Sequence, residues 1–281
     1  MSLGFKPPAL STGEILRAAC YTTSALSRHK FEACLFGSVA GLLHGMDSRA
    51  PKDVDLFILN STQDQDDEAI KDLLVQSEPE RFFLVDSLTV GATHRVLWFN
   101  VDDPQVNSSQ KQKVSSSKSA SATSGACGQS RRVCKIDILS PQMLGLPPIS
   151  SSELQYHPTL SYSSLLKTTS VSDVDPEECP VAFIPLFPLI LLKLRAWEDH
   201  SLPNARDIMR DRVPQDEDDI EELLCLASTG NKSTLLRQPA KRGKYWSLGG
   251  FQSPNEAERC IRKYVEKWPR SVKRWRAIGF M

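Results

Sequence analysis

Two aspartates lie within an otherwise apolar segment, and they limit what residues 35–59 (LFGSVAGLLHGMDSRAPKDVDLFIL) can form. In a β-strand alternate side chains share a face, so Asp53 and Asp55 project to one side and the intervening Val54 to the other. Two carboxylates about 7 Å apart on one strand face repel each other unless a cation lies between them. The pair therefore predicts a cation-binding position at the start of a buried strand.

A third aspartate has the same setting. Asp137 stands between Ile136 and Ile138 in KIDIL, a segment that is typical of a buried strand. If this strand lies beside the first, Asp137 completes a cluster of three carboxylates. Hard oxygen ligands suit Mg²⁺ or Mn²⁺, and Mg²⁺ also takes phosphate oxygens from a substrate. Such a cluster is typical of two-metal phosphoryl transfer, in which one ion activates the attacking hydroxyl and the other neutralises the leaving pyrophosphate.

Gly37 and Ser38 fit the same chemistry. They follow a predicted strand, EACLF at 32–36, and precede a short predicted helix that Ser38 opens and Gly45 closes. A glycine after a strand lets the backbone approach a phosphate closely, and the start of the next helix offers free N–H groups. There is no GxxxxGK[ST] pattern, so this is not a P-loop. The simpler alternative is a turn followed by an ordinary helix cap.

The remaining periodicity predicts strands and helices that alternate, followed by a helical end. A helix is expected at 11–28, opened by a capping box of Ser11 and Glu14. The other expected strands are 54–60, 81–90, 93–101 and 131–139, and the other expected helices are 64–77, 186–200, 214–227 and 254–268. The predicted fold class is α/β (α+β): a mixed sheet flanked by helices, with a helical C-terminal half.

The composition divides the chain into three parts. Residues 1–140 are the predicted core, and they include a Ser-rich insertion at about 108–130 that has too few large apolar groups to order itself. Residues 141–180 are a Pro/Ser-rich connector, and residues 181–281 form the helical C-terminal region.

Cysteine and histidine usage gives a first indication of the compartment. The seven cysteines form no CxxC pair and the five histidines no HxH or HExxH, which argues against a zinc site and for a reducing compartment. No signal peptide is evident in MSLGFKPPAL, and the longest apolar run, 181–192, is too short for a membrane span. We therefore expect an intracellular protein, cytoplasmic or nuclear, without a membrane partner.

The charge is distributed unevenly. From Asn231 to Met281 there are thirteen Lys and Arg against three Asp and Glu, a net of +10 in a chain whose total is zero. This asymmetry is compatible with a polyanionic partner such as RNA. The residues expected to face solvent are Arg262, Lys263, Lys267, Arg270, Lys273, Arg274 and Arg276. The alternative is an ordinary solvated surface.

The sequence resembles the DNA polymerase β-like nucleotidyltransferase superfamily, whose signature is hG[GS]…R…DhDh. The resemblance lies in the order of its elements: a strand, Gly-Ser, a short helix, DxD and a later strand with one aspartate. The resemblance implies that Gly37 and Ser38 bind a triphosphate, that Asp53 and Asp55 bind metal, and that Asp137 is the third carboxylate. Arg49 stands at the family's arginine. LLKLRAWEDH and DDIEELL are similar to helices of the minimal, abortive-infection-type members, which implies Lys193 near the nucleotide and Asp219 at a helix start.

The expected function is Mg²⁺-dependent transfer of a nucleotidyl group from an NTP to an acceptor hydroxyl on RNA or protein, with release of pyrophosphate. Asp137 would help to activate the acceptor. Two alternatives remain open: a catalytically silent relative that binds nucleotides, and a nucleic-acid-binding protein that acts through its basic C-terminus. Arg49 has the alternative of a surface ion pair, and Lys193 that of reaching solvent from an apolar helix.

Overall fold

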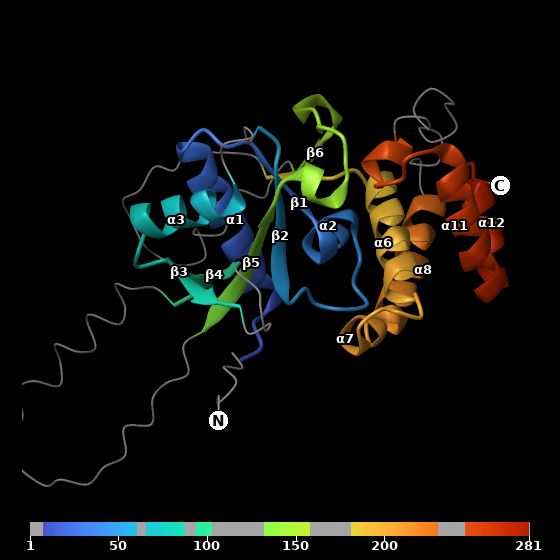
Figure 1. Cartoon of the computed structure of the whole chain (residues 1–281), viewed down its shortest axis with the longest axis horizontal. Coiled ribbons are helices and arrows are strands. Elements are labelled where there is room, and N and C mark those ends of the chain that lie inside the picture. Colours follow the sequence, from blue (N-terminus) through green and yellow to red (C-terminus); the bar gives the residue numbers. More distant parts are fainter. Residues whose placement is uncertain are drawn as a thin grey trace, which may run out of the picture.

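A seven-stranded mixed sheet is the centre of the fold (Figure 1). The structure is a computed structural model that describes residues 8–60, 66–87, 94–102, 132–157, 181–229 and 245–280. The strand order is β3-β4-β5-β2-β1-β7-β6. The strands are β1 (Ala33–Phe36), β2 (Asp53–Ile58), β3 (Phe82–Asp86), β4 (Arg95–Asn100), β5 (Val133–Leu139), β6 (Gln155–Tyr156) and β7 (Ala182–Phe183). β2 runs parallel to β5 and antiparallel to β1, so the predicted mixed sheet is confirmed.

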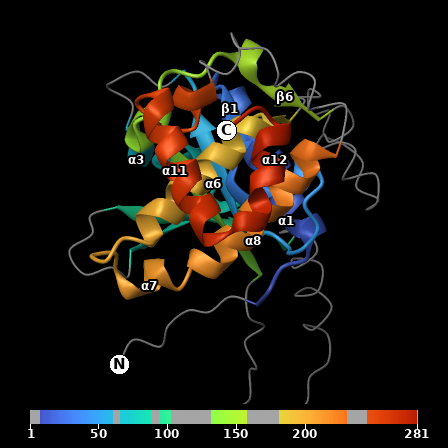
Figure 2. The same ribbon diagram turned by 90° about the vertical axis from the view of Figure 1, so that its right-hand side faces the viewer.

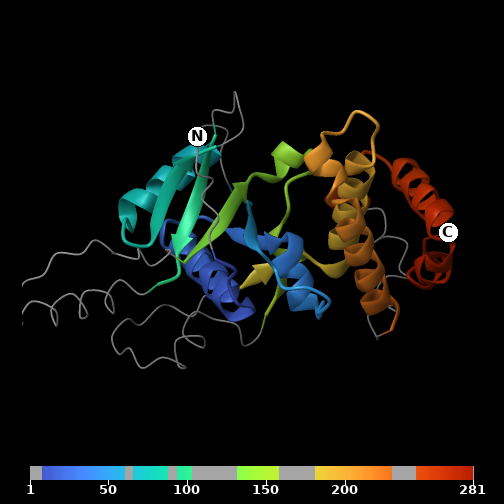
Figure 3. The ribbon, with the colours of Figure 1, turned by 90° about the horizontal axis from the view of Figure 1, so that it is seen from below.

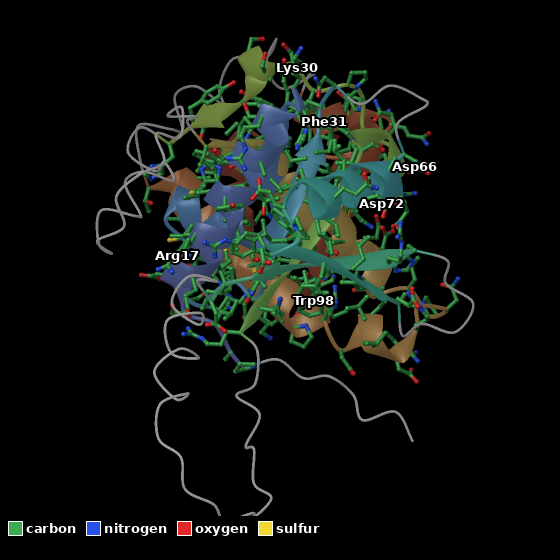
Figure 4. The ribbon with its side chains drawn as sticks, turned by 90° about the vertical axis from the view of Figure 1, so that its left-hand side faces the viewer. Arg17, Lys30, Phe31, Asp66, Asp72 and Trp98 are labelled. Atoms are coloured by element: carbon green, nitrogen blue, oxygen red, sulfur yellow. The ribbon has the colours of Figure 1, made fainter. Side chains whose placement is uncertain are left out.

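Three N-terminal helices flank this sheet. α1 (Thr12–Arg28) contacts β1 and β2, α3 (Asp67–Ser77) contacts β3 and β5, and α2 (Gly37–His44) contacts β1, β2 and the C-terminal helix α6 (Leu186–His200). The capping box of Ser11 and Glu14 forms at the start of α1 as predicted. Figure 4 looks onto α1 and α3 from the side away from the C-terminal helices and labels Lys30 and Phe31, which lie between α1 and β1.

The C-terminal helices form a layer beside α2. They are α6, α7 (Asp207–Arg210), α8 (Val213–Ser228), α11 (Pro254–Lys267) and α12 (Val272–Ala277). Figures 1 and 3 show α6 and α8 next to the sheet domain, and Figure 2 shows α11 and α12 in front of them, on the outer side. One hydrophobic core runs through both halves and includes Leu35, Leu56, Leu194, Leu223 and Tyr264. No helix in the described ranges is long and apolar enough to cross a membrane.

The sheet extends beyond the segments in which strands were expected. Residues 141–157, part of the expected connector, contain the 3-10 helices η1 (Pro141–Leu144) and η2 (Ser151–Glu153) together with β6. β7 belongs to the expected helical region but pairs with β1. Both strands are only two residues long, which is too short to show an alternating pattern.

The start of α2 corrects one expectation. Ser38 was expected to be the N-cap, but the cap position is Phe36, which makes no side-chain cap, and Ser38 lies inside the first turn. The chain passes from β1 into α2 through Gly37, whose φ of 63° favours glycine. The predicted end of the helix is confirmed, because Gly45 has the left-handed conformation with a φ of 106°. α11 also begins with a side-chain cap, since the Ser253 hydroxyl accepts from the Glu256 backbone N–H.

The Ser-rich segment 108–130 lies outside the described residues, so its disorder stays a prediction. The residues on either side of the gap support a simple test, because Asn100 of β4 pairs with Val133 of β5 and the connection joins adjacent strand ends. We expect a short Gly-Ser linker in place of 108–130 to change the free energy of unfolding by only about 0.6 kcal/mol for each halving of the loop. Urea unfolding measures this change. A loss several times larger would mean that the segment packs against the fold.

Candidate active site

The register of the sheet brings the three aspartates together. Asp55 of β2 is paired with Asp137 of β5, and Asp53 is paired with Lys135. The expectation that the two strands are neighbours is therefore confirmed, although eighty-one residues separate Asp55 from Asp137 in the chain. All three aspartates line one cleft of about 500 Å³ between the sheet and the C-terminal helices.

Gly37 and Ser38 line the same cleft. A Cβ added to Gly37 would lie 2.0 Å from the Asp55 Oδ2, so no larger residue fits without displacing the carboxylate. Ser38 is buried in the first turn of α2. The N-terminus of α2 thus adjoins the aspartates, where its free N–H groups favour negative charge.

The Asp55 carboxyl is the most perturbed group in the cleft. Burial, followed by the charges of Asp53 and Asp137, raises its pKa to about 7, against the opposing charges of Lys193 and Lys135. A bound cation would relieve the repulsion that the neighbouring carboxylates exert on Asp55. Their oxygen chemistry suits a hard divalent ion.

The three side chains do not converge on one point. Among the described residues, no three His, Cys, Asp or Glu side chains form a ready-made metal-binding group. One physical reason lies on β5 itself, where Lys135 forms an ion pair with Asp137 on the same strand face. Asp53 and Asp55 therefore fit a divalent ion as a pair, and Asp137 joins them only if its carboxylate leaves Lys135.

Arg49 and Lys193 line the cleft, but their hydrogen bonds go to Asp219 of α8. Nε and Nη2 of Arg49 each donate to a different Asp219 oxygen at 2.7 Å, and Lys193 Nζ donates to Oδ2 at 2.7 Å. The Asp219 side chain is fully buried, whereas those of Arg49 and Lys193 are 21% and 15% exposed. Burial raises the pKa of the Asp219 carboxyl, but the Arg49 hydrogen bonds and the Lys193 charge outweigh it and hold the pKa below its usual value.

The loop between α2 and β2 is anchored at a second point on α8. The Asp47 backbone N–H donates to the Glu222 carboxylate at 2.7 Å, and the Ser48 hydroxyl and backbone N–H donate to the same group. With the Arg49–Asp219 pair, these bonds tie the segment that leads into Asp53 to the helical half of the protein. The helical half therefore helps to position the aspartate-bearing strand.

Six further polar side chains that the sequence analysis did not single out line the cleft: Lys52, Lys135, His200, Arg212, Gln215 and Asp216. Lys52 and Arg212 are exposed, and neither forms an ion pair with any residue that the structure describes. These two are the cations of the cleft most readily available to a phosphate group. Lys52 could have been found from its place directly before Asp53, whereas no local pattern marks Arg212.

No family model matches the sequence, and no curated protein matches it significantly. Among solved structures, the chain is similar to an antigenic nucleotidyltransferase-like protein from Paracoccidioides brasiliensis, with a TM-score of 0.54 and 15% sequence identity. The alignment covers 96% of this chain and 95% of that protein. JHP933 from Helicobacter pylori aligns with 95% of this chain over 98% of its own at 13% identity, but its TM-score of 0.35 is too low to support an argument. The chain therefore has a nucleotidyltransferase-like fold. The comparisons do not distinguish the minimal, abortive-infection-type subclass.

Proposed function

We propose that the protein is a nucleotidyltransferase that transfers a nucleotidyl group from an NTP to an acceptor hydroxyl and releases pyrophosphate, with Mg²⁺ or Mn²⁺ as cofactor. One observation carries this proposal: the cleft that joins the Gly37–Ser38 turn to Asp53, Asp55 and Asp137. The nucleotidyltransferase-like fold supports it.

Different residues of the cleft would have different roles. The backbone N–H groups after Gly37 would hold the triphosphate, with Lys52 and Arg212 as counter-charges. Asp53 and Asp55 would hold the divalent ion, which when bound supplies Lewis-acid stabilisation of the charge on the phosphates. Asp137 would accept the proton of the acceptor hydroxyl. Arg49 and Lys193 add positive potential to the same cleft, although their hydrogen bonds go to Asp219.

Incubation with each α-labelled NTP, Mg²⁺, and either total RNA or the protein alone tests this function. We expect label to become covalently attached to one acceptor, with release of one pyrophosphate per transfer and no transfer in EDTA. Mg²⁺-dependent NTP binding without transfer to any acceptor would identify a catalytically silent relative instead.

The basic C-terminal surface bears on RNA as the acceptor. Five of its seven residues form ion pairs with glutamates of α6, α8 or α11: Arg262, Lys263, Lys267, Arg270 and Arg274. The cation is exposed in four of these pairs, whereas only Glu258 among the glutamates is exposed. Ion pairs at the surface contribute only about 0–1 kcal/mol, so a phosphate could replace the glutamate. Lys273 and Arg276 form no ion pair with any described residue.

We therefore expect the double variant Lys273→Glu/Arg276→Glu to weaken RNA binding and to lower its log–log salt slope by about one unit per lost phosphate contact. NTP binding should not change, because the phosphate-holding groups of the cleft lie elsewhere. Fluorescence anisotropy over a range of salt concentrations measures both. The matched control is Lys30→Glu, an exposed lysine on the opposite side of the molecule (Figure 4). A salt slope that equals that of the wild type would show that the basic surface does not bind RNA.

A further inference from the structure

α6 presents one continuous stripe of side chains to the cleft. The members of the stripe recur every three or four residues, so they lie on one face of the helix. They are Leu189, Leu192, Lys193, Ala196 and His200. His200 is the last residue of α6 and the one histidine among the described residues that line the cleft. It stands on the helical wall, whereas Asp53, Asp55 and Asp137 stand on the sheet wall.

His200 is held by a buried carboxylate. Its Nδ1 lies 2.6 Å from Oδ2 of Asp216, in the first turn of α8. The Asp216 side chain is 8% exposed and that of His200 is 17% exposed. A carboxylate accepts hydrogen bonds, so Nδ1 carries a hydrogen and Nε2 remains for the cleft. An imidazole that is oriented in this way by a buried carboxylate is the usual arrangement of a proton-transfer group.

The charged groups around His200 come from three directions. Asp216 and Arg212 at the start of α8 and Lys193 on α6 line the cleft together with His200. The neighbouring α7 contributes the apolar Ile208 to the cleft. The sheet wall opposite carries Lys52 and Lys135 together with the three aspartates. An anionic group that enters the cleft would therefore enter a space that both His200 and Arg212 line.

We propose that His200, positioned by Asp216, is the acid that gives a proton to the leaving pyrophosphate; this inference rests on the proposed function. In phosphoryl transfer the attacking and leaving oxygens lie roughly in line on opposite sides of phosphorus. If Asp137 on the sheet wall faces the attacking hydroxyl, the opposite wall faces the leaving oxygen. Among the described residues of that wall His200 is the histidine, and an imidazole can both donate and accept a proton.

The step balances in atoms and charge. The acceptor hydroxyl gives its proton to the Asp137 carboxylate, and its oxygen forms a bond to the α-phosphorus as the bond from that phosphorus to the pyrophosphate oxygen breaks. The electron pair of the broken bond stays on that oxygen, which receives the proton from Nε2 of His200. Asp216 stays ionised and keeps its hydrogen bond to Nδ1. His200 is left neutral and takes a new proton from solvent after pyrophosphate departs.

The first test needs no turnover. Side-chain NMR signals of His200 are followed during a titration with inorganic pyrophosphate in the presence of Mg²⁺. We expect these signals to shift and the pKa of the imidazole to rise, because the anion favours the imidazolium. Asp216→Asn should reduce the rise, and the signals of the exposed His94 should stay unchanged as the internal control. Unchanged signals of His200 would overturn the proposal.

The second test uses turnover. His200→Gln should lower kcat a hundredfold or more, as the loss of a general acid does, with little change in KM. The loss of kcat relative to the wild type should be smaller with an NTP whose β,γ-bridging oxygen is replaced by CF₂, because that leaving group needs less protonation. Imidazole in solution should restore part of the activity of His200→Ala. His94→Gln is the matched control.

Two results would overturn the proton-donor role. One is a loss of kcat in His200→Gln that is equal for the normal NTP and for its CF₂ analogue. The other is a rise in KM alone, which would mean that the pair only ties α6 to α8. A wild-type protein without transfer to any acceptor would refute the proposed function and the donor role together, and the NMR titration would then decide whether His200 contacts pyrophosphate.

Discussion

Asp53→Asn and Asp55→Asn are each expected to reduce nucleotidyl transfer to background while the fold stays intact. In the proposed function these two carboxylates hold the divalent ion, and an amide would replace an anionic oxygen ligand with a neutral one. Labelled transfer and near-UV circular dichroism are measured on the same preparations. Asp86→Asn is the matched control, because Asp86 is an exposed strand aspartate on β3 outside the cleft. Full activity in both cleft variants would show that Asp53 and Asp55 do not take part in the reaction.

The same substitution at Asp55 has a consequence for stability that depends on pH. The pKa of this carboxyl is about 7 in the folded protein, against 3.8 as its ordinary value. Between these values the folded protein holds a proton that the unfolded chain has lost, so stability falls as pH rises from about 4 to about 7. Above pH 7 the full cost of ionisation is present, on the order of a few kcal/mol at most.

Asp55→Asn removes this cost. In EDTA it should melt above the wild type at pH 8, and the difference should shrink toward zero near pH 4. Added Mg²⁺ should raise the melting temperature of the wild type and leave that of Asp55→Asn nearly unchanged. An Asn variant that melts below the wild type at pH 8 without metal would contradict the repulsion on which the cation site rests.

The sheet wall of the site could be predicted from the sequence because its signals are local. An aspartate at every second position of an apolar strand and a glycine directly after another strand are visible in a few residues. The pairing of Asp55 with Asp137 needed only one further assumption, that the two strands are neighbours, and the register of β2 and β5 confirms it.

The contacts of the helical wall could not be predicted because they join distant parts of the chain. Arg49 and Asp219 are 170 residues apart, and no local pattern in the sequence indicates that the arginine pairs with a buried carboxylate. His200 and Asp216 lie on different helices. The charge asymmetry was visible as a count, but its pairing with Glu198, Glu217 and Glu221 depends on how α11 and α12 pack against α6 and α8.

The largest loss of stability is expected from Asp219→Ala. The carboxylate is fully buried and satisfies the guanidinium of Arg49 and the ammonium of Lys193 at once. Its removal leaves two largely buried cations without their partner, and breaking a buried ion pair in this way costs about 3–5 kcal/mol. Urea unfolding measures the change. Asp218→Ala is the matched control, since Asp218 is the exposed neighbour on the same helix and should cost no more than about 0.5 kcal/mol.

The same pair of variants decides what Arg49 does. If Asp219→Ala lowers the free energy of unfolding no more than Asp218→Ala does, the ion pairs of Asp219 do not stabilise the protein. Arg49 and Lys193 would then be free to bind a nucleotide, as the family resemblance implies. If Asp219→Ala is severe, Arg49→Ala should also destabilise the protein, because it leaves Asp219 with Lys193 alone. The double variant should then lose less than the sum of the single losses, since the two residues share one interaction. Because Arg49 lies only four residues before Asp53, loss of the Arg49–Asp219 ion pair should also loosen the loop that leads to Asp53 and Asp55.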